Sequence, residues 1–232
     1  MQLFYASINQ GYAILTEDEM RHCTKTLRKK VGDTIVVMDG KGAWFEVVLD
    51  QISKRQVLCK IVKEVPLAPS PNYTIHIAIA PTKNIDRLEF FLEKATEMGI
   101  GKVSLLLCQR SERRKVRVDR LQRILLSAAK QSLKAHLPIV TELISFRKFI
   151  SNCGDQQKLI AHCLEGTQSL SKTYQKEQDV CILIGPEGDF SPEEIDWALE
   201  HGFKPISLGK SRLRTETAGI VACHSIHLLN NL

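Results

Sequence analysis

Two short loops carry residue types that could bind a ligand closely through their backbones. The first, Gly185-Pro186-Glu187-Gly188, ends an apolar run, and the second, Leu208 to Leu213, ends another. Glycine has no Cβ atom, so the chain at Gly185, Gly188 and Gly209 can approach a ligand closely or take a positive φ angle. Both loops are therefore candidate ligand-binding loops, although a simple strand–turn–helix junction would also explain either one.

Each loop leads into a predicted helix. Ser191 is expected to cap the helix after the first loop, with Pro192 at its first position and Glu194 completing a capping box. Thr215 or Thr217 is expected to cap the helix after the second loop. A loop held between a strand and a capped helix forms a preorganised surface, and two such loops could hold a flat heterocycle between them. The phosphate-binding patterns G-x-x-x-x-G-K-[ST] and G-x-G-x-x-G are absent from the places where they would act.

The elements that position these loops alternate between strand and helix after residue 73. Strands are predicted at 73–81, 102–108, 158–164, 179–185 and 204–209, and helices at 84–99, in the basic region, after Ser191 and at the end of the chain. Short apolar strands between helices predict an α/β fold with a parallel sheet covered on both faces. Ligands bind such sheets at the carboxyl ends of the strands, where both loops lie.

The first part of the chain has a different character. Strand-like runs at 34–38, 43–52 and 56–65 surround the hairpin signal Asp39-Gly40-Lys41-Gly42, and a basic turn or helix is expected within 19–33. Residues 64–73 hold three prolines and read as a linker. The expected domains are a small β domain at 1–68 and the α/β domain at 73–232.

Positive charge is concentrated in one segment. Residues 109–136 hold nine Lys or Arg and two Asp or Glu, a net +7, against +6 for the whole chain of 232 residues. A basic stripe of this kind is typical of a surface that binds a polyanion such as nucleic acid, although a solvated helix face is the alternative.

The sequence does not favour a membrane protein, a secreted protein or a metal-binding protein. No apolar run approaches the length of a membrane span, and the N-terminus lacks the features of a signal peptide. The seven cysteines form no C-x-x-C pair and read as free thiols in a reducing compartment. His224 and His227 have no partner ligands nearby in the sequence, so no metal site is expected.

The motifs together resemble a known family. "ILIGPEGDFSPEEID" and "LGKSRLRTETA" are similar to the two cofactor-loop motifs of the SPOUT methyltransferases. "RHCTKTLRKKVGDTIVVMDGKG", "KNIDRLEFFLEKATEMGIGKV", "QRSERRK" and "SAAKQSLKAHLP" extend the likeness over the whole chain. More narrowly, the sequence resembles the RsmE family of 16S ribosomal RNA uridine-N3 methyltransferases.

The resemblance implies a SPOUT fold with a C-terminal trefoil knot, preceded by a PUA-like β-barrel that binds RNA. It implies a cytoplasmic homodimer, with no membrane and no metal, that acts on ribosomal RNA or the assembled small subunit. S-adenosylmethionine would be the methyl donor. The residues implied to bind this cofactor are Cys163, Leu164, Gly185, Pro186, Glu187, Gly188, Leu208, Gly209, Leu213, Thr215, Thr217 and Ala218. The basic residues implied to bind RNA are Arg28, Lys29 and Lys30 in the first domain and Arg110, Arg113, Arg114 and Lys134 in the second.

Arg214 and Glu216 are the candidate catalytic residues. Methylation at N3 of uracil requires loss of a proton, so a guanidinium at Arg214 could stabilise the developing anion and Glu216 could position the base or handle the proton. Alternatively, Arg214 forms an ion pair with Glu187, and Glu216 only stabilises the helix dipole. Two other functions stay open: a SPOUT methyltransferase for transfer RNA or a ribose 2′-OH, and a non-catalytic RNA-binding factor for ribosome assembly.

Overall fold

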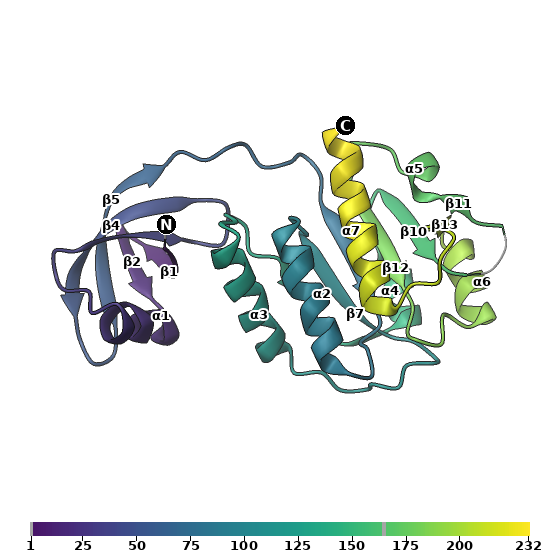
Figure 1. The fold of residues 1–232 in the computed structure, drawn as a ribbon, viewed down its shortest axis with the longest axis horizontal. Coiled ribbons are helices and arrows are strands. Elements are labelled where there is room, and N and C mark those ends of the chain that lie inside the picture. Colours follow the sequence, from purple (N-terminus) through teal and green to yellow (C-terminus); the bar gives the residue numbers. More distant parts are fainter. Residues whose placement is uncertain (1, 164–165) are drawn as a thin grey trace. The chain divides into compact units, whose positions relative to one another are not determined.

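The computed structural model describes residues 2–163 and 166–232. The chain forms two compact units (Figure 1), which are described separately here. One comprises the residues up to Ser70 together with Leu126–Leu137, and the other comprises Pro71–Leu125 together with Pro138–Leu232.

The first unit is a closed five-stranded barrel in the described part of the chain. Its strands follow the order β1 (Leu3–Asn9), β2 (Tyr12–Leu15), β5 (Val57–Val65), β4 (Trp44–Ile52) and β3 (Thr34–Met38). Neighbours are antiparallel, except that β1 closes the barrel in parallel with β3. The helical segment between β2 and β3 consists of α1 (Glu17–Arg21) and a π-helical turn, η1 (His22–Thr26). The PUA-like barrel expected from the resemblance is therefore confirmed.

The hairpin between β3 and β4 is also confirmed, and its turn chemistry is visible. Gly40 and Gly42 have φ angles of 74° and 118°, which other residues rarely adopt. The Asp39 carboxylate accepts hydrogen bonds from the amides of Lys41 at 2.7 Å and Ala43 at 3.1 Å. The hairpin sets the register of β3 and β4, and thereby the barrel core around Phe4, Val37, Val47, Leu49 and Cys59.

Residues 126–137 complete the first unit, although the domain boundaries expected from sequence place them in the second. Ala129 packs with Leu3, Met38 and Trp44, and the Leu137 amide donates to the Gly40 carbonyl at 2.9 Å. Lys130 forms an ion pair with Glu19, whose side chain is buried. These contacts join distant parts of the sequence, so periodicity within the segment could not reveal them.

The second unit contains an eight-stranded parallel sheet in the described residues. The order is β11 (Gln168–Ser169), β13 (Lys204–Ser207), β10 (Gln157–Ala161), β12 (Val180–Ile184), β6 (Ile75–Ile79), β7 (Lys102–Leu107) and β8 (Ile139–Val140), with β9 (Ile144–Ser145) also paired to β7. The five predicted strands are confirmed. The two-residue strands β8, β9 and β11 were not predicted, because segments this short carry no periodicity.

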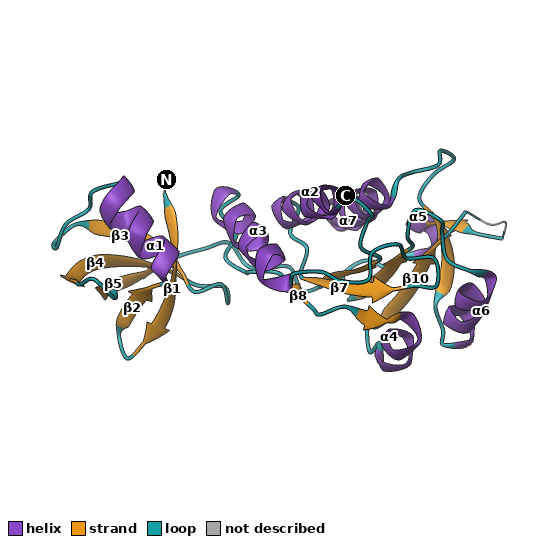
Figure 2. Ribbon diagram, turned by 90° about the horizontal axis from the view of Figure 1, so that it is seen from below, coloured by secondary structure: helices purple, strands orange, loops and turns teal. Residues whose placement is uncertain are grey.

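Helices cover both faces of this sheet (Figure 2), as predicted. The helices on the sheet are α2 (Ile85–Glu97), α4 (Phe146–Asn152), α5 (Leu170–Thr173), α6 (Pro192–Glu200) and α7 (Thr215–Asn231). Helix α3 (Val118–Gln131) begins in this unit and ends within the segment that completes the first unit. Helices α2 and α7 lie together on one face, and α4 and α6 lie on the other. Gly219 of α7 allows the close approach to α2, because a Cβ atom there would lie 2.7 Å from Cε2 of Phe91.

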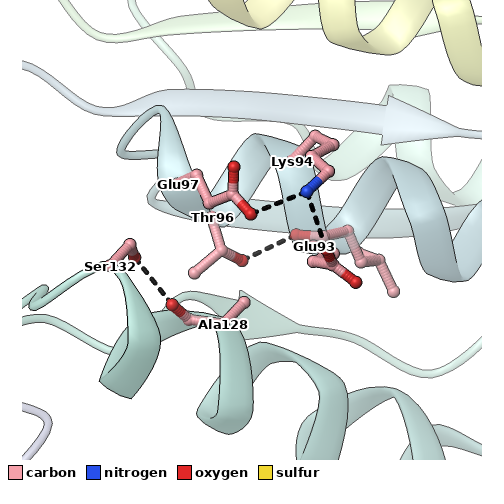
Figure 3. Close-up of polar contacts among 7 residues, drawn as sticks. Glu93, Lys94, Thr96, Glu97, Ala128 and Ser132 are labelled. Carbon is pink, nitrogen blue, oxygen red and sulfur yellow. Dashed lines mark hydrogen bonds and ion pairs between the residues drawn. The ribbon is translucent and has the colours of Figure 1, made fainter.

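The ends of the helices follow local rules. The capping box of α6 is confirmed: the Glu194 amide donates to Ser191 Oγ at 3.3 Å, and the Ser191 amide donates to the Glu194 carboxylate at 3.0 Å. On α2, the Lys94 ammonium lies between the carboxylates of Glu93 at 2.7 Å and Glu97 at 2.9 Å (Figure 3). The cap predicted for α7 was wrong. Arg214, rather than Thr215 or Thr217, is the N-cap residue.

Among the described residues, no helix is long and apolar enough to cross a membrane.

Candidate functional site

A cavity of about 370 Å³ lies where three strands of the parallel sheet end. The loops after β10, β12 and β13 line it together with the first turn of α7. The lining residues are Ala161, His162, Cys163, Thr167, Ile184, Gly185, Pro186, Glu187, Asp189, Ile206, Ser207, Leu208, Gly209, Lys210, Ser211, Arg212, Leu213, Thr215 and Ala218. The position agrees with the general location of ligand sites in parallel sheets.

Most residues predicted to bind a cofactor meet at this cavity. They are Cys163, Gly185, Pro186, Glu187, Leu208, Gly209, Leu213, Thr215 and Ala218. Gly188 and Thr217 are not among its lining residues, and Leu164 lies outside the described residues. The structure thus brings together the two glycine loops identified in the sequence and adds the loop after β10.

The loop after β12, residues 185–191, is closed by contacts within itself. A Cβ atom at Gly185 would lie only 3.1 Å from the Phe190 amide nitrogen and 3.2 Å from its ring. The Asp189 amide donates to the Pro186 carbonyl at 2.9 Å, which closes a tight turn. A side chain at Gly185 would therefore force Phe190 to shift by a few tenths of an ångström, whether or not a ligand is bound.

Asp189 connects two of the three loops, and sequence reasoning did not identify it. One carboxylate oxygen accepts from the Cys163 amide at 3.1 Å, and the other accepts from the Phe190 amide at 2.8 Å. Asp189 has a φ angle of 63°, a conformation that Asp tolerates better than most residues. The sequence shows only that an acidic residue directly follows the glycine motif. The hydrogen bond from the Cys163 amide joins residues 26 positions apart, so it forms only in the folded protein.

Neighbouring segments fix the same loop from outside. The Glu187 carboxylate accepts from the Lys83 amide at 2.9 Å. The Arg110 guanidinium donates to the carbonyls of Gly188 at 2.8 Å and Phe190 at 3.3 Å. The buried Thr215 hydroxyl donates to the Gly185 carbonyl at 3.1 Å, which joins the start of α7 to this loop.

The loop after β13 is less constrained. Gly209 has a φ angle of 136°, and residues 209–212 are exposed. The Ser207 side chain forms hydrogen bonds of 3.1 and 3.2 Å with Gly209. Within the described residues, no side chain caps the first turn of α7, so the positive end of its dipole lies beside Thr215 and Ala218 at the cavity.

Two titratable groups in the cavity are shifted by burial. Burial lowers the pKa of His162, although the nearby Asp189 carboxylate opposes this effect. Burial and then the charge of Asp189 raise the pKa of the Cys163 thiol. At neutral pH, the imidazole is therefore mainly uncharged and the thiol is protonated, which makes Cys163 a poor nucleophile.

The two catalytic candidates lie beside the cavity lining rather than in it. Arg214 is exposed and forms no ion pair with Glu187 or another described residue. Glu216 is only 7% exposed, with one carboxylate oxygen 3.9 Å from the Arg87 guanidinium and the other buried without a hydrogen-bond partner in the described part of the chain. The guanidinium of Arg214 is thus available for a ligand, whereas Glu216 faces Arg87.

The basic residues divide into two groups. Besides Arg110, Arg113 is committed to the protein, since its guanidinium donates to the carbonyls of Thr82 at 2.9 Å and Lys83 at 2.6 Å. Arg114 is exposed and lines a second cavity of about 560 Å³ in the same unit. The other basic residues lining that second cavity are Arg113, Lys115, Arg117 and Arg120. In the barrel unit, Arg28 and Lys30 are exposed, and Lys29 and Lys134 are partly exposed.

Comparisons with known proteins agree with this arrangement. Residues 68–227 match the sequence profile of an RNA methyltransferase domain, and residues 15–62 match that of an RNA methyltransferase PUA domain. The chain is 30% identical over 230 residues to ribosomal RNA small subunit methyltransferase E of Synechocystis, covering 96% of this chain and 75% of the relative.

Solved structures extend the likeness to the fold. A probable rRNA-methyltransferase from Porphyromonas gingivalis is 41% identical, with a TM-score of 0.91 over 100% of this chain and 99% of that one. A ribosomal RNA small subunit methyltransferase E from Neisseria gonorrhoeae, bound to S-adenosyl methionine, is 27% identical, with a TM-score of 0.87 over 99% of this chain and 98% of that one. The chain therefore belongs to the RNA methyltransferase family, in the group of ribosomal RNA small subunit methyltransferase E.

Proposed function

We propose that the protein transfers a methyl group from S-adenosylmethionine to N3 of a uridine in 16S ribosomal RNA of the small subunit. The observation that supports this most directly is the cavity formed by three loops at the carboxyl ends of β10, β12 and β13. It lies in the part of the chain that matches the methyltransferase profile, and a relative of the same fold binds S-adenosyl methionine.

The cofactor site that we propose follows the cavity lining. Backbone groups of Gly185, Leu208, Gly209 and Leu213 would contact the donor, and Asp189 would hold the loops in place. Pro186, Glu187, Cys163, Thr215 and Ala218 complete the lining. Gly188 and Thr217 act less directly in this proposal, because neither lines the cavity.

The chemistry is a direct displacement. The uracil N3 electron pair attacks the methyl carbon, the carbon–sulfur bond breaks, and neutral S-adenosylhomocysteine leaves. The N3 proton passes to a base or to water. Because the protein mainly aligns donor and acceptor, rate enhancement comes from positioning and from stabilising the uracil anion. Arg214 suits the second task, since its side chain is exposed and follows Leu213 of the cavity. Glu216 would position Arg87 and the start of α7 rather than remove the proton.

RNA binding is assigned to two surfaces. In the barrel unit, Arg28, Lys29, Lys30 and Lys134 supply positive charge. In the methyltransferase unit, Arg114 and Lys115 at the second cavity are the better candidates. Arg110 and Arg113 already donate to backbone carbonyls, and Arg117 and Arg120 already pair with Asp119 and Glu89. Phosphate contacts of this kind make RNA affinity strongly dependent on salt.

The proposal includes a homodimer, a trefoil knot around the cavity loops and a cytoplasmic location. Seven free cysteines suit a reducing compartment. The dimer would use the exposed part of α7, where Leu228 is 46% exposed. Ile226 is fully buried in its own chain, so a charge at that position would test folding and not assembly. Leu228→Glu is the suitable variant, with the mass in solution measured by light scattering.

One experiment tests the function. Purified protein and labelled S-adenosylmethionine are added separately to naked 16S ribosomal RNA, to assembled small subunits and to transfer RNA, and the methylated position is mapped. Label at uridine N3 in either form of 16S RNA supports the proposal. Label in transfer RNA or on a ribose would reassign the substrate, and RNA binding without transfer would indicate an assembly factor. Arg214→Ala should reduce transfer while donor affinity stays unchanged.

A further inference from the structure

A second cluster of titratable side chains lies in the methyltransferase unit, at the amino ends of the parallel strands, whereas the cavity lies at their carboxyl ends. His76, near the start of β6, is the register partner of Cys181, near the start of β12. Asp155 and Cys153 come from the turn between α4 and β10. His76 and Cys181 are buried, whereas Cys153 and Asp155 are partly exposed.

These side chains are close enough to share one ion. His76 Nδ1 lies 3.0 Å from the Asp155 carboxylate, and the Cys153 thiol lies 3.2 Å from the same oxygen. The ligand atoms of His76, Asp155 and Cys181 all lie within 4.8 Å of one another. The Cys153 thiol, which donates to that carboxylate oxygen, lies next to these three groups and is the fourth candidate ligand.

We propose that this cluster binds a zinc ion through the Cys153 and Cys181 sulfurs, His76 Nδ1 and the Asp155 carboxylate. Two sulfurs, one imidazole nitrogen and one carboxylate oxygen are donors that zinc accepts, and four protein ligands without an open position are typical of a structural site. The ion replaces two thiol protons, which pass to the solvent.

The surroundings of His76 fit this role. Its other ring nitrogen, Nε2, lies 2.9 Å from the hydroxyl of Ser104, which is buried on β7. When Nε2–H donates to that hydroxyl, Nδ1 keeps its electron pair for a metal. Ligating histidines usually have such a partner, which fixes the ring orientation. The Phe149 ring packs edge-on against the imidazole, with the centroids 5.6 Å apart.

Charge and access also fit. Two thiolates, one carboxylate and Zn²⁺ leave a single negative charge, and Lys102, the register partner of His76 on β7, supplies a positive charge nearby. The Asp155 side chain is 17% exposed, so an ion can reach the cluster from solvent. The sequence predicted no metal here, because the four ligands come from three separate segments and show no motif spacing.

Cobalt substitution tests the site on the full chain. The protein is treated with a chelator under a phosphine reductant and then titrated with Co²⁺ alone. We expect a thiolate-to-cobalt charge-transfer band with one equivalent bound, displaced by Zn²⁺. Zinc should also raise the thermal unfolding temperature of the wild-type protein, because it binds the folded state.

Matched variants identify the ligands. Cys153→Ser and Asp155→Asn, both at partly exposed positions in a turn, should remove or strongly shift the band, whereas Cys163→Ser should leave it intact. Ser104→Ala should weaken cobalt binding by about 10-fold or more while keeping the thiolate band. Circular dichroism checks that each variant is folded. A wild-type protein without the band, or a band that persists unchanged in folded Cys153→Ser and Asp155→Asn, would overturn the proposal and leave a hydrogen-bonded core cluster.

Discussion

The two glycine loops of the cavity look alike in sequence but differ in how the structure holds them. The loop at 185–191 is fixed by Asp189, Arg110, Thr215 and the amide of Lys83. The loop at 208–214 has exposed residues at 209–212 and is held by the hydrogen bonds of Ser207. The comparison indicates that the first loop is preorganised and that the second is held by fewer contacts, which would allow it to adjust to a ligand in the function proposed above.

Breaking the rigid loop at its tightest point should have the largest effect. In Gly185→Val, the added atoms meet the Phe190 amide and ring, where the space for a Cβ atom is already only 3.1–3.2 Å. Overpacking of this kind costs about 1–3 kcal/mol, so donor affinity should fall about fivefold or more. Calorimetric titration with S-adenosylmethionine measures it. Gly188→Ala is the control, since its Cβ would meet only the Arg110 side chain at an ordinary 3.5 Å. Equal losses in both variants would show that the crowding at 185 is unimportant.

Removing the Asp189 carboxylate, which joins the loop after β12 to the loop after β10, should have the next largest effect on donor affinity. Asp189→Ala leaves the amides of Cys163 and Phe190 without their acceptor and places alanine at a positive φ angle. Each of these exposed or half-buried hydrogen bonds contributes about 0.5–1.5 kcal/mol, so donor affinity should fall severalfold. Asp189→Asn keeps one acceptor and tolerates the backbone, so it should recover part of the donor affinity. If alanine and asparagine bind the donor as tightly as the wild type, the loops are held by other contacts.

Two arginine variants distinguish residues that hold the 185–191 loop from residues proposed to bind RNA. Arg110→Ala removes the hydrogen bonds to Gly188 and Phe190 and should weaken donor binding, with the salt dependence of RNA binding unchanged. Arg114→Ala should leave donor binding unchanged and reduce the slope of log K against log salt by about one unit or less, as expected for one phosphate contact. Filter binding at several salt concentrations checks both. The reverse pattern would exchange the roles assigned to the two residues.

The smallest effect concerns pH. The pKa of His162 is lowered from 6.5 in the folded protein, chiefly by burial. As the pH falls through about 6.5, His162 takes up a proton more readily in the unfolded chain than in the folded chain. The free energy of unfolding therefore decreases as the pH falls. His162→Gln should therefore lose less stability than the wild type between about pH 7.5 and about pH 5.5 in urea unfolding. Parallel curves for the two proteins would assign the acid sensitivity to other groups.

Local patterns explain why much of this architecture could be predicted. Strands β6, β7 and β12 are nearly continuous apolar runs, and the capping box at Ser191 and Glu194 is a local signal. The glycines of both loops were visible for the same reason. Periodicity and capping operate within a few residues, which is the range that sequence reasoning covers.

Features that depend on distant partners could not be predicted. The Asp189 carboxylate accepts a hydrogen bond from the Cys163 amide across the cavity, and Arg110 and Arg113, which the sequence predicts to bind RNA, donate to backbone carbonyls. Arg214 takes the N-cap position that the threonines were expected to occupy, because Thr215 donates to Gly185 instead. Each of these hydrogen bonds joins residues that are far apart in the sequence and meet only in the folded protein.

The discontinuous first unit has a consequence for synthesis of the chain. Its barrel strands are complete by Val65, but Ala129, Lys130 and Leu137, which pack with or bond to Trp44, Glu19 and Gly40, are added some seventy residues later. Domains generally fold as units during translation, starting from the N-terminus. The barrel surface around Trp44 therefore stays uncovered while β6, α2 and β7 of the other unit emerge from the ribosome. A ribosome-bound chain halted before residue 126 should therefore be more sensitive to protease in its barrel than one halted after the segment to Leu137 has emerged.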